Sequence, residues 1–456
     1  MYRPPPRSPY GIIGVRGDVP HPGCIFVCVS KRGICVTAYF QLLRRNPDFA
    51  RLWIAQVISL LGDWFNVIAL SALVSEYSGG SGMAISGLLI ARFLPPLVVS
   101  PLAGVLIDRF DRKRLLILSD VLRAIIILLL LFATGPDMLW LIYLLTVIQF
   151  CLSALFEPGR SAIMPSLVQP DDLLKANTLG NVTWSVMLAF GAMAGGAVTA
   201  ALGTAAALVI DALTFLVSAW FITQIKTRPE PAAAVSAAHR GGSFREGLRY
   251  LAQHPASAAL LFVKLGLSIG NVDSLIIAYG TILFVVGESG TGSLGVLYSA
   301  FGVGAVLGPA LLNRFSDGSV RTLRRLVIVG FVLVVIGWLL MGSAAGLWVA
   351  ALALIVRSMG GSVNWTYSST MIQMGTPDRF LGRVFSLDWV GFSLAQTIST
   401  LIIGLLLDTL GGHNAPVIAL GTGIVSIIPL AVWWLIVHRL EHAAPEPAAA
   451  ASPVET

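Results

Sequence analysis

The chain has 456 residues, of which 56% are apolar and only 12% charged, and its mean hydropathy is +0.83. Soluble globular proteins carry about a quarter charged residues, so this composition excludes an ordinary soluble protein and indicates that most of the chain lies in lipid. The formal net charge of +7 implies no nucleic-acid partner, because basic loops facing anionic membrane lipids account for it.

The first 40 residues contain no apolar run long enough to cross a bilayer. The longest run, GCIFVCV, lies within a group of three cysteines, Cys24, Cys28 and Cys35. Their spacing is not that of zinc modules, so we expect neither a metal site nor a cofactor there. Residues 1–40 are expected to be a disordered tail, or to include an over-long start with the true one near Val36.

Twelve apolar segments follow this tail. A bilayer core of about 30 Å requires about 20 residues of helix, and backbone groups in hydrocarbon must be hydrogen-bonded within their own helix. The sequence therefore predicts an all-α membrane protein with twelve transmembrane helices. The segments are residues 51–75, 83–107, 115–134, 138–160, 177–202, 204–225, 256–285, 292–313, 326–343, 347–372, 384–409 and 415–437.

Lysine and arginine lie in alternate loops. The loops at residues 75–83, 134–139 and 410–415 contain neither, whereas the loops on the opposite side, such as 109–114 and 314–325, contain most of the basic residues. The positive-inside rule places the basic loops in the cytoplasm. Both termini lie on the same side as these loops and are therefore expected to be cytoplasmic.

The chain also shows an internal repeat. Gly62-Asp63 matches Gly270-Asn271, LIDRF at 106–110 matches LLNRF at 311–315, and Pro-Asp at 170–171 matches Pro-Asp at 377–378. Three landmarks in the same order indicate a parallel duplication of six helices. We expect halves at residues 41–225 and 256–438, a cytoplasmic linker at 226–255 with an amphipathic helix in SFREGLRYLAQHP, and a disordered tail at 439–456.

Residues 104–116 read GVLIDRFDRKRLL, with six charges between two apolar segments. In a duplicated twelve-helix chain this turn resembles the signature of the major facilitator superfamily. The runs NPDFARLWIAQVISLLGDWFNVIAL, FEPGRSAIMPSLV and LGRVFSLDWV resemble its drug:proton antiporter branch, which includes macrolide exporters, the enterobactin exporter and the lysophospholipid transporter. The resemblance covers residues 40–440.

This resemblance implies a secondary transporter of the bacterial inner membrane that works by alternating access. The expected activity is proton-coupled efflux of a hydrophobic drug or a siderophore-like small molecule, by a monomer in contact with membrane lipids, protons and its substrate. The alternative is a flippase for lysophospholipid or another lipid. In that case the cavity opens sideways to lipid, and the cationic Lys264 and Arg357 meet a phosphate.

In that superfamily the charged turn joins the two halves on the cytoplasmic side. Gly104 is expected to allow close helix packing, and Asp108 to face the positive end of the 384–409 segment. Arg109 or Arg112 is then expected to reach Asp388. The alternative is that the basic residues of the turn only fix the topology of the chain.

Polar residues within the apolar segments carry most of the functional information, because a charge at the bilayer centre is costly. At helical spacing they form one stripe on each of several segments, and the resemblance implies that these stripes line a central cavity. The stripes comprise Gln56, Asp63 and Asn66; Gln149, Ser153 and Glu157; Lys264, Ser268 and Asn271; and Arg357, Gly361, Asn364 and Ser368.

Asp273 does not fit the stripe on its own segment. It is nine residues from Lys264, which places it on the opposite side of an ideal helix. Either the segment bends at Gly270 and Asp273 joins the cavity, or Asp273 faces a neighbouring helix. Arg92 and Arg123 lie nearer the ends of their segments, and we expect them to extend toward the lipid headgroups.

Asp63 is the first candidate for proton coupling. Burial favours the protonated carboxyl, while a nearby Lys264 or Arg357 favours the ionised form, so substrate binding or opening of the cavity can change its protonation. The alternative is a permanent ion pair of Asp63 with Lys264 or Arg357 that braces the two halves. Glu157, beside Arg160, is the second candidate or belongs to the gate.

Three other classes of protein are disfavoured. The sequence contains no GxxxxGK[ST] loop, which argues against an ATP-driven pump. It contains no HExxH or nucleophile and base pattern, which argues against an intramembrane enzyme. A receptor that does not transport has no need of titratable groups at mid-membrane depth.

Overall fold

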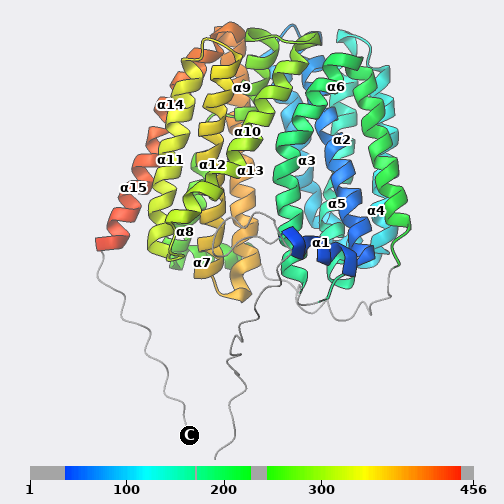
Figure 1. Cartoon of the computed structure of the whole chain (residues 1–456). Coiled ribbons are helices and arrows are strands. Elements are labelled where there is room, and N and C mark those ends of the chain that lie inside the picture. The colour runs from blue at the N-terminus through cyan, green and yellow to red at the C-terminus, as the bar shows by residue number, and fades with distance from the viewer. Residues whose placement is uncertain (1–35, 170–171, 227–243, 443–456) are drawn as a thin grey trace, which may run out of the picture.

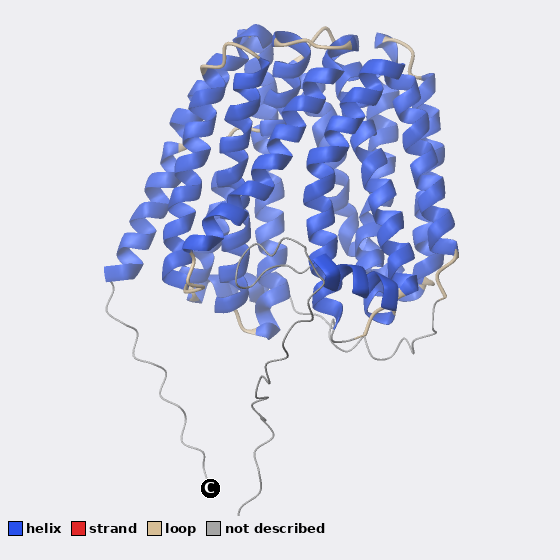
Figure 2. Cartoon of the chain, in the orientation of Figure 1, coloured by secondary structure: helices blue, strands red, loops and turns tan. Residues whose placement is uncertain are grey.

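The computed structural model describes residues 36–169, 172–226 and 244–442. The described residues form helices that run side by side between two ends of a bundle, with no strand among them (Figures 1 and 2). The end that carries α1 and α7 is here called the basic end, and the opposite end, where α2 finishes at Tyr77, the distal end.

The α-helices are α1 Val36–Arg45, α2 Pro47–Tyr77, α3 Gly82–Arg109, α4 Arg112–Leu129, α5 Leu139–Ile163, α6 Leu173–Thr223, α7 Phe244–Gln253, α8 Pro255–Leu267, α9 Val272–Ala278, α10 Thr291–Leu312, α11 Val320–Gly342, α12 Leu347–Gly375, α13 Asp378–Leu410, α14 Ala415–Val425 and α15 Ile427–His442. The short turns are η1 Leu130–Phe132, η2 Pro136–Met138, η3 Met164–Ser166, η5 Tyr279–Leu283, η6 Glu288–Gly290, η7 Asn313–Phe315 and η8 Gly412–Asn414.

Eleven helices of the described chain are long and apolar enough to cross a membrane, compared with twelve predicted segments. The difference lies in α6, whose 51 residues would measure about 75 Å if straight, far more than a bilayer core. Gly203 interrupts it at φ 83°. A Cβ atom at Gly62 of α2 would meet Thr214, and one at Gly191 would meet Trp64, so both arms of α6 pack beside the same turn of α2. The chain therefore folds back on itself at Gly203.

The predicted segment 256–285 is also interrupted. Gly270 adopts φ +72°, and Asn271 begins α9 by accepting a hydrogen bond from Ser274 N at 2.8 Å. The predicted bend at Gly270 is confirmed, but Asp273 does not belong to the lining of the cavity described below. The last segment is divided in the same way into α14 and α15.

The ends of the described chain are more helical than the sequence predicted. Helix α1 begins at Val36 and buries Leu42, so the predicted disordered tail of residues 1–40 is too long. Helix α15 continues to His442. The helix predicted in the linker is present as α7 at the basic end, while Ser243 and the rest of the linker to residue 227 lie outside the described residues.

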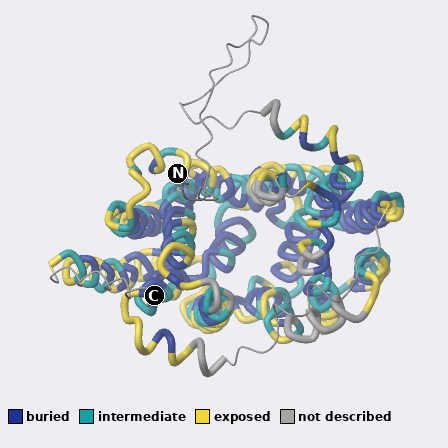
Figure 3. Tube along the Cα trace, turned by 90° about the horizontal axis from the view of Figure 1, so that it is seen from below, coloured by how far each residue is buried: buried dark blue, intermediate teal, exposed yellow. Residues whose placement is uncertain are grey.

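Large apolar side chains cover the outside of the bundle. Figure 3 shows exposed residues on the outward sides of the helices and buried residues inside. Trp220, Leu213 and Trp348 are among the large apolar residues exposed to more than half of their surface. Because exposed apolar surface of this extent is stable only against lipid, the chain is a multi-pass membrane protein.

Helices α1–α6 and α8–α15 form two neighbouring groups that meet at the distal end (Figure 1). The Asp408 carboxylate of α13 accepts hydrogen bonds from the backbone N–H groups of Gly82, at 2.6 Å, and Met83, at 3.1 Å, at the start of α3. A Cβ atom at Gly82 would lie 2.4 Å from the Gly404 carbonyl oxygen, so the two backbones touch. This glycine contact is distal, whereas the surroundings of Gly104 lie outside the described side chains.

Helices α11 and α12 depend on a similar close approach, which gives a test of the packing. A Cβ atom at Gly337 would lie 2.4 to 2.5 Å from Cβ, Cα and N of Arg357, so Gly337→Ala must push the two helices apart. We expect a loss of about 1–3 kcal/mol in stability, measured as a lower melting temperature of the purified protein in detergent. Gly421→Ala is the matched control, since no heavy atom lies within 4 Å of its added Cβ. Equal melting of the two variants would contradict this packing.

Candidate functional site

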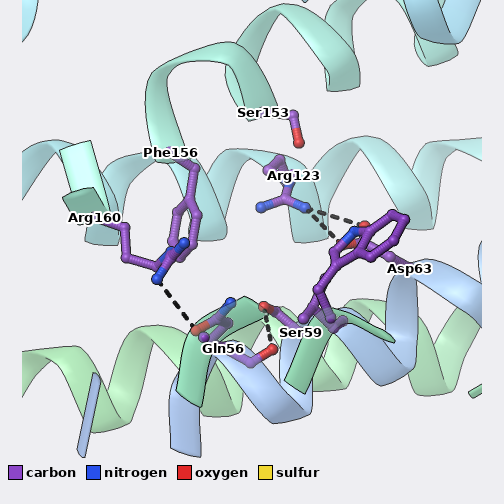
Figure 4. A pocket seen from close by; sticks show the side chains of 10 residues that line it. Gln56, Ser59, Asp63, Arg123, Ser153, Phe156 and Arg160 are labelled. Carbon is purple, nitrogen blue, oxygen red and sulfur yellow. Dashed lines mark hydrogen bonds and ion pairs between the residues drawn. The ribbon is translucent and has the colours of Figure 1, made fainter. Parts of the chain in front are cut away.

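A cavity of about 360 Å³ opens between α2, α4, α5 and α6 (Figure 4). Its wall combines aromatic and apolar side chains with an acid, two arginines and small polar groups. The lining residues are Gln56, Ser59, Leu60, Asp63, Arg123, Ser153, Phe156, Arg160, Gly180 and Trp184. Of the predicted cavity residues, Gln56, Asp63 and Ser153 belong to this lining.

The central interaction of the cavity is an ion pair between Asp63 and Arg123. Arg123 Nη2 lies 3.1 Å from Asp63 Oδ1 and 3.4 Å from Oδ2 (Figure 4). The Asp63 side chain is 31% exposed, whereas that of Arg123 is only 3% exposed. The guanidinium carbon of Arg123 also lies 3.8 Å from the centre of the Phe215 ring of α6. The prediction that Arg123 extends to the headgroups is therefore wrong, because Phe215 and Asp63 keep its guanidinium inside the bundle.

A second carboxylate, on the same helix as Arg123, also forms an ion pair with it. Asp120 Oδ1 lies 3.3 Å from Arg123 Nη1, and Asp120 Oδ2 accepts a hydrogen bond of 2.6 Å from the Ser218 hydroxyl of α6. The side chains of Asp120, Arg123 and Ser218 are buried among helices α2, α4 and α6, whereas that of Asp63 is partly exposed. One cation is thus shared by two anions in apolar surroundings.

Lys264, one expected partner of Asp63, is bound elsewhere. Its ammonium group pairs with Asp388 of α13 and lies 4.4 Å from the centre of the Trp365 ring. The predicted alternative of an ion pair between Asp63 and Lys264 is therefore wrong. Asp388 was expected to meet Arg109 or Arg112, but the described ion pair joins it to Lys264, and the Arg109 side chain lies outside the described residues.

The polar stripe of α12 packs partly against α11. With its amide oriented to satisfy both atoms, Asn364 donates to Val327 O at 2.9 Å and accepts from Phe331 N at 3.3 Å. Arg357, the other expected partner of Asp63, packs with its guanidinium 5.2 Å from the Trp338 ring of α11. Both residues are buried and neither belongs to the lining of the cavity described above.

The other predicted cavity residues lie in different surroundings. Asn271 begins α9 and donates to Thr400 Oγ1 at 2.7 Å, which joins α9 to α13. Gln149 and Asn66 are buried and outside the cavity lining. Arg160 donates to Gln56 Oε1 at 3.3 Å at the cavity wall. The side chains of Glu157 and Asp108 lie outside the described residues.

Asp273 connects the two groups of helices. It lies in the first turn of α9, and electrostatic interactions link it to Arg92 of α3 and Arg357 of α12. The Arg92 guanidinium carbon lies 5.2 Å from the Phe150 ring centre. Arg92 therefore points inward, so the prediction that it extends to the headgroups is wrong as well.

Sequence reasoning missed two aspartates beside the cavity. Asp120 precedes Arg123 by one helical turn, which is a recognisable ion-pair spacing. Asp211 is the lone charged residue of the apolar segment 204–225, and a carboxylate at that depth is itself a signal. In the structure Asp211 is fully buried on α6, and neither carboxylate oxygen has a hydrogen-bond partner among the described residues. The described residues contain no group of three or more acidic, His or Cys side chains placed to hold a metal ion.

Residues 39–451 match the major facilitator family MFS_3, described as "Transmembrane secretion effector". The chain belongs to this family. It is 26% identical over 374 residues to the putative bacilysin exporter BacE of Bacillus subtilis, covering 82% of this chain and 90% of the relative. It is also 26% identical over 380 residues to macrolide efflux protein A of Streptococcus pyogenes, covering 80% and 91%.

Solved structures with the same fold are also transporters. A variant of the nucleoside transporter NupG matches with a TM-score of 0.69 at 11% identity, covering 85% of this chain and 99% of that one. An inward-facing bacterial homologue of the lysosomal transporter Spinster matches with a TM-score of 0.66 at 14% identity, covering 89% and 99%. The family and the fold together make the protein a membrane transporter of the major facilitator type, and such transporters are not enzymes.

Removing Arg123 tests the ion network. Arg123→Met leaves Asp63 and Asp120 without their shared cation, so we expect a loss of about 3–5 kcal/mol in stability and a clearly lower melting temperature. Arg325→Met is the control, because Arg325 is 62% exposed and its pair with Glu441 is of the surface type, where the expected change is below about 1 kcal/mol. If both variants melt alike, the network does not stabilise the protein.

Proposed function

We propose that this transporter exports a hydrophobic small molecule across the bacterial cell membrane in exchange for protons. The observation that carries the proposal is the ion pair of Asp63 and Arg123 at the wall of a cavity, because it places a partly exposed titratable group inside a membrane protein. Relatives named as exporters support outward transport.

The topology that we propose has twelve crossings and both termini in the cytoplasm. Its support is the reversal of α6 at Gly203, which gives the long helix two arms of membrane length, and the concentration of arginine at the basic end. Alternating access then moves residues 41–225 against residues 256–438. The distal contacts of Asp408 with α3 hold the outer side closed in this conformation.

The cavity wall suits a substrate with apolar and cationic parts. Leu60, Phe156 and Trp184 offer apolar and aromatic surface, and the Asp63 carboxylate offers a negative charge. A macrolide with an amine group has this chemistry. We propose that a cationic substrate and a proton compete for Asp63, so that release of one follows binding of the other.

The test is transport by the purified protein in liposomes with an imposed pH gradient. We expect erythromycin to accumulate only when the gradient is present, and Asp63→Asn to abolish this accumulation while retaining exchange of labelled for unlabelled erythromycin. The reason is that an amide keeps the shape of the carboxyl but cannot carry a proton. Transport of erythromycin that ignores the gradient, or movement of labelled lysophospholipid in its place, would overturn proton-coupled drug export.

A double variant separates coupling from bracing. If the ion pair only braces the helices, Asp63→Asn leaves Arg123 with an incomplete set of partners, and the variant should lose stability and every mode of transport together. Asp63→Asn combined with Arg123→Gln would then restore the melting temperature. A stable single variant that exchanges but does not accumulate erythromycin supports coupling.

We also propose that Gly104, Asp108, Arg109 and Arg112 form the cytoplasmic gate, with Glu157 near it, when the basic end closes. Asp108→Asn should leave expression and melting unchanged and reduce transport at least tenfold, because it weakens a contact of the closed gate only. Asp111→Asn is the control in the same turn, since Asp111 accepts a hydrogen bond from Arg114 N at 2.8 Å as a helix cap, which asparagine can replace.

The gate is read out by thiol labelling of a cysteine placed at Ser153 on the cavity wall, in a background without native cysteines. Labelling from the cytoplasmic side should rise in Asp108→Asn and remain at the parent level in Asp111→Asn. Equal labelling of all three proteins would argue against a gate at Asp108.

A further inference from the structure

Asp211 lies where α6 presses against α2. A Cβ atom at Gly62 would lie 2.5 Å from Asp211 Oδ1, so the missing side chain of Gly62 makes the space that the Asp211 carboxyl occupies. Asp211 is 0% exposed, and the cavity does not reach it. It lies against Gly62, the residue next to Asp63 on α2.

The hydrogen bonding of Asp211 differs from that of Asp120, which is equally buried. Asp120 has Arg123 on one oxygen and the Ser218 hydroxyl on the other. Neither oxygen of Asp211 has a hydrogen-bond partner of normal geometry among the described residues, although the Asn66 side chain lies near enough to interact with the carboxyl. An ionised carboxylate is not stable when it is buried without compensation, whereas a protonated carboxyl is tolerated far better.

The charged groups around Asp211 also favour its protonated form. The groups that interact with it are Asp63 and Asn66 on α2 and Arg123 on α4. Helix α10, which also packs on α6, contains no acidic or basic residue, and Glu288 of η6 lies at the distal end beside Gly203. Arg123 is already shared by Asp63 and Asp120, so ionisation of the buried Asp211 would add a second uncompensated negative charge to this group.

We infer that Asp211 is the proton-binding site of the transporter in this conformation, and that Asp63 connects it to the cavity. This inference rests on the proposed proton-coupled function, and it assigns storage of the proton to Asp211 instead of Asp63. Asp63 is the exposed partner that exchanges with water, while Asp211 is the buried partner that holds the proton.

The proton transfer needs only the residues present. The O–H bond of Asp211 breaks as an O–H bond forms on Asp63, and Arg123, which interacts with both carboxyl groups, moves its charge from Asp63 toward Asp211. The number of protons and the net charge of the group are unchanged. Asp63, protonated and facing the cavity, then gives its proton to water there.

Infrared spectroscopy of the purified full-length protein tests the protonation without any substrate. A protonated buried carboxyl has its own carbonyl stretch, so the spectrum of wild type minus Asp211→Asn should contain this band, and the spectrum of wild type minus Asp408→Asn should not. Asp408 is the control because its carboxylate accepts hydrogen bonds from two backbone N–H groups, which favour the ionised form. Asp211→Ser gives a second assignment should the asparagine variant fail to fold. Absence of the band from both Asp211 difference spectra would overturn the inference.

The transport role is tested in the same liposomes with erythromycin and an imposed pH gradient. We expect Asp211→Asn to reduce the gradient-driven accumulation of erythromycin at least tenfold and to retain exchange of labelled for unlabelled erythromycin. Accumulation at the wild-type level in Asp211→Asn would overturn the role of Asp211 while leaving proton coupling intact. Failure of the wild type itself to respond to the gradient would overturn the proposed function, and the coupling role of Asp211 with it.

Discussion

The structure depends on one buried cation, Arg123, which is held between the carboxylates of Asp63 and Asp120. In an apolar interior a guanidinium is stable only with such partners, and the buried carboxylate of Asp120 in turn depends on the guanidinium. Three helices, α2, α4 and α6, meet around this group, and the cavity opens beside its exposed member. The same interaction therefore stabilises one half of the protein and supplies a titratable group to the proposed transport path.

Glycine permits the helices to come close enough for this arrangement. Gly62 leaves the space that Asp211 and Thr214 occupy, and the contact of Gly82 with Gly404 joins α3 to α13 at the distal end. These close contacts act together with polar caps such as Asp408 on α3. In lipid, where no hydrophobic force drives helices together, small residues and buried hydrogen bonds are the main sources of helix association.

The sequence was sufficient for the helical membrane fold, because apolar segments of membrane length and the glycine at 270 leave signals within a single helix. It was not sufficient for the partners of the buried charges. Asp63 pairs with Arg123 in its own half, whereas Lys264 and Arg357 were expected, because helical spacing shows which residues share a face but not which helix lies opposite. Asn364 faces α11 for the same reason. Asp211 was visible as a lone carboxylate, but its lack of partners is a property of the packed structure.

The central claim is that movement of substrate and movement of protons are coupled through Asp63 and its neighbours. The most direct measurement uses liposomes without any pH gradient, containing a trapped pH indicator, in which a steep erythromycin gradient drives transport. We expect protons to move opposite to erythromycin, in a fixed ratio, and this proton movement to be lost in Asp63→Asn. Erythromycin movement without any accompanying proton flux would contradict it.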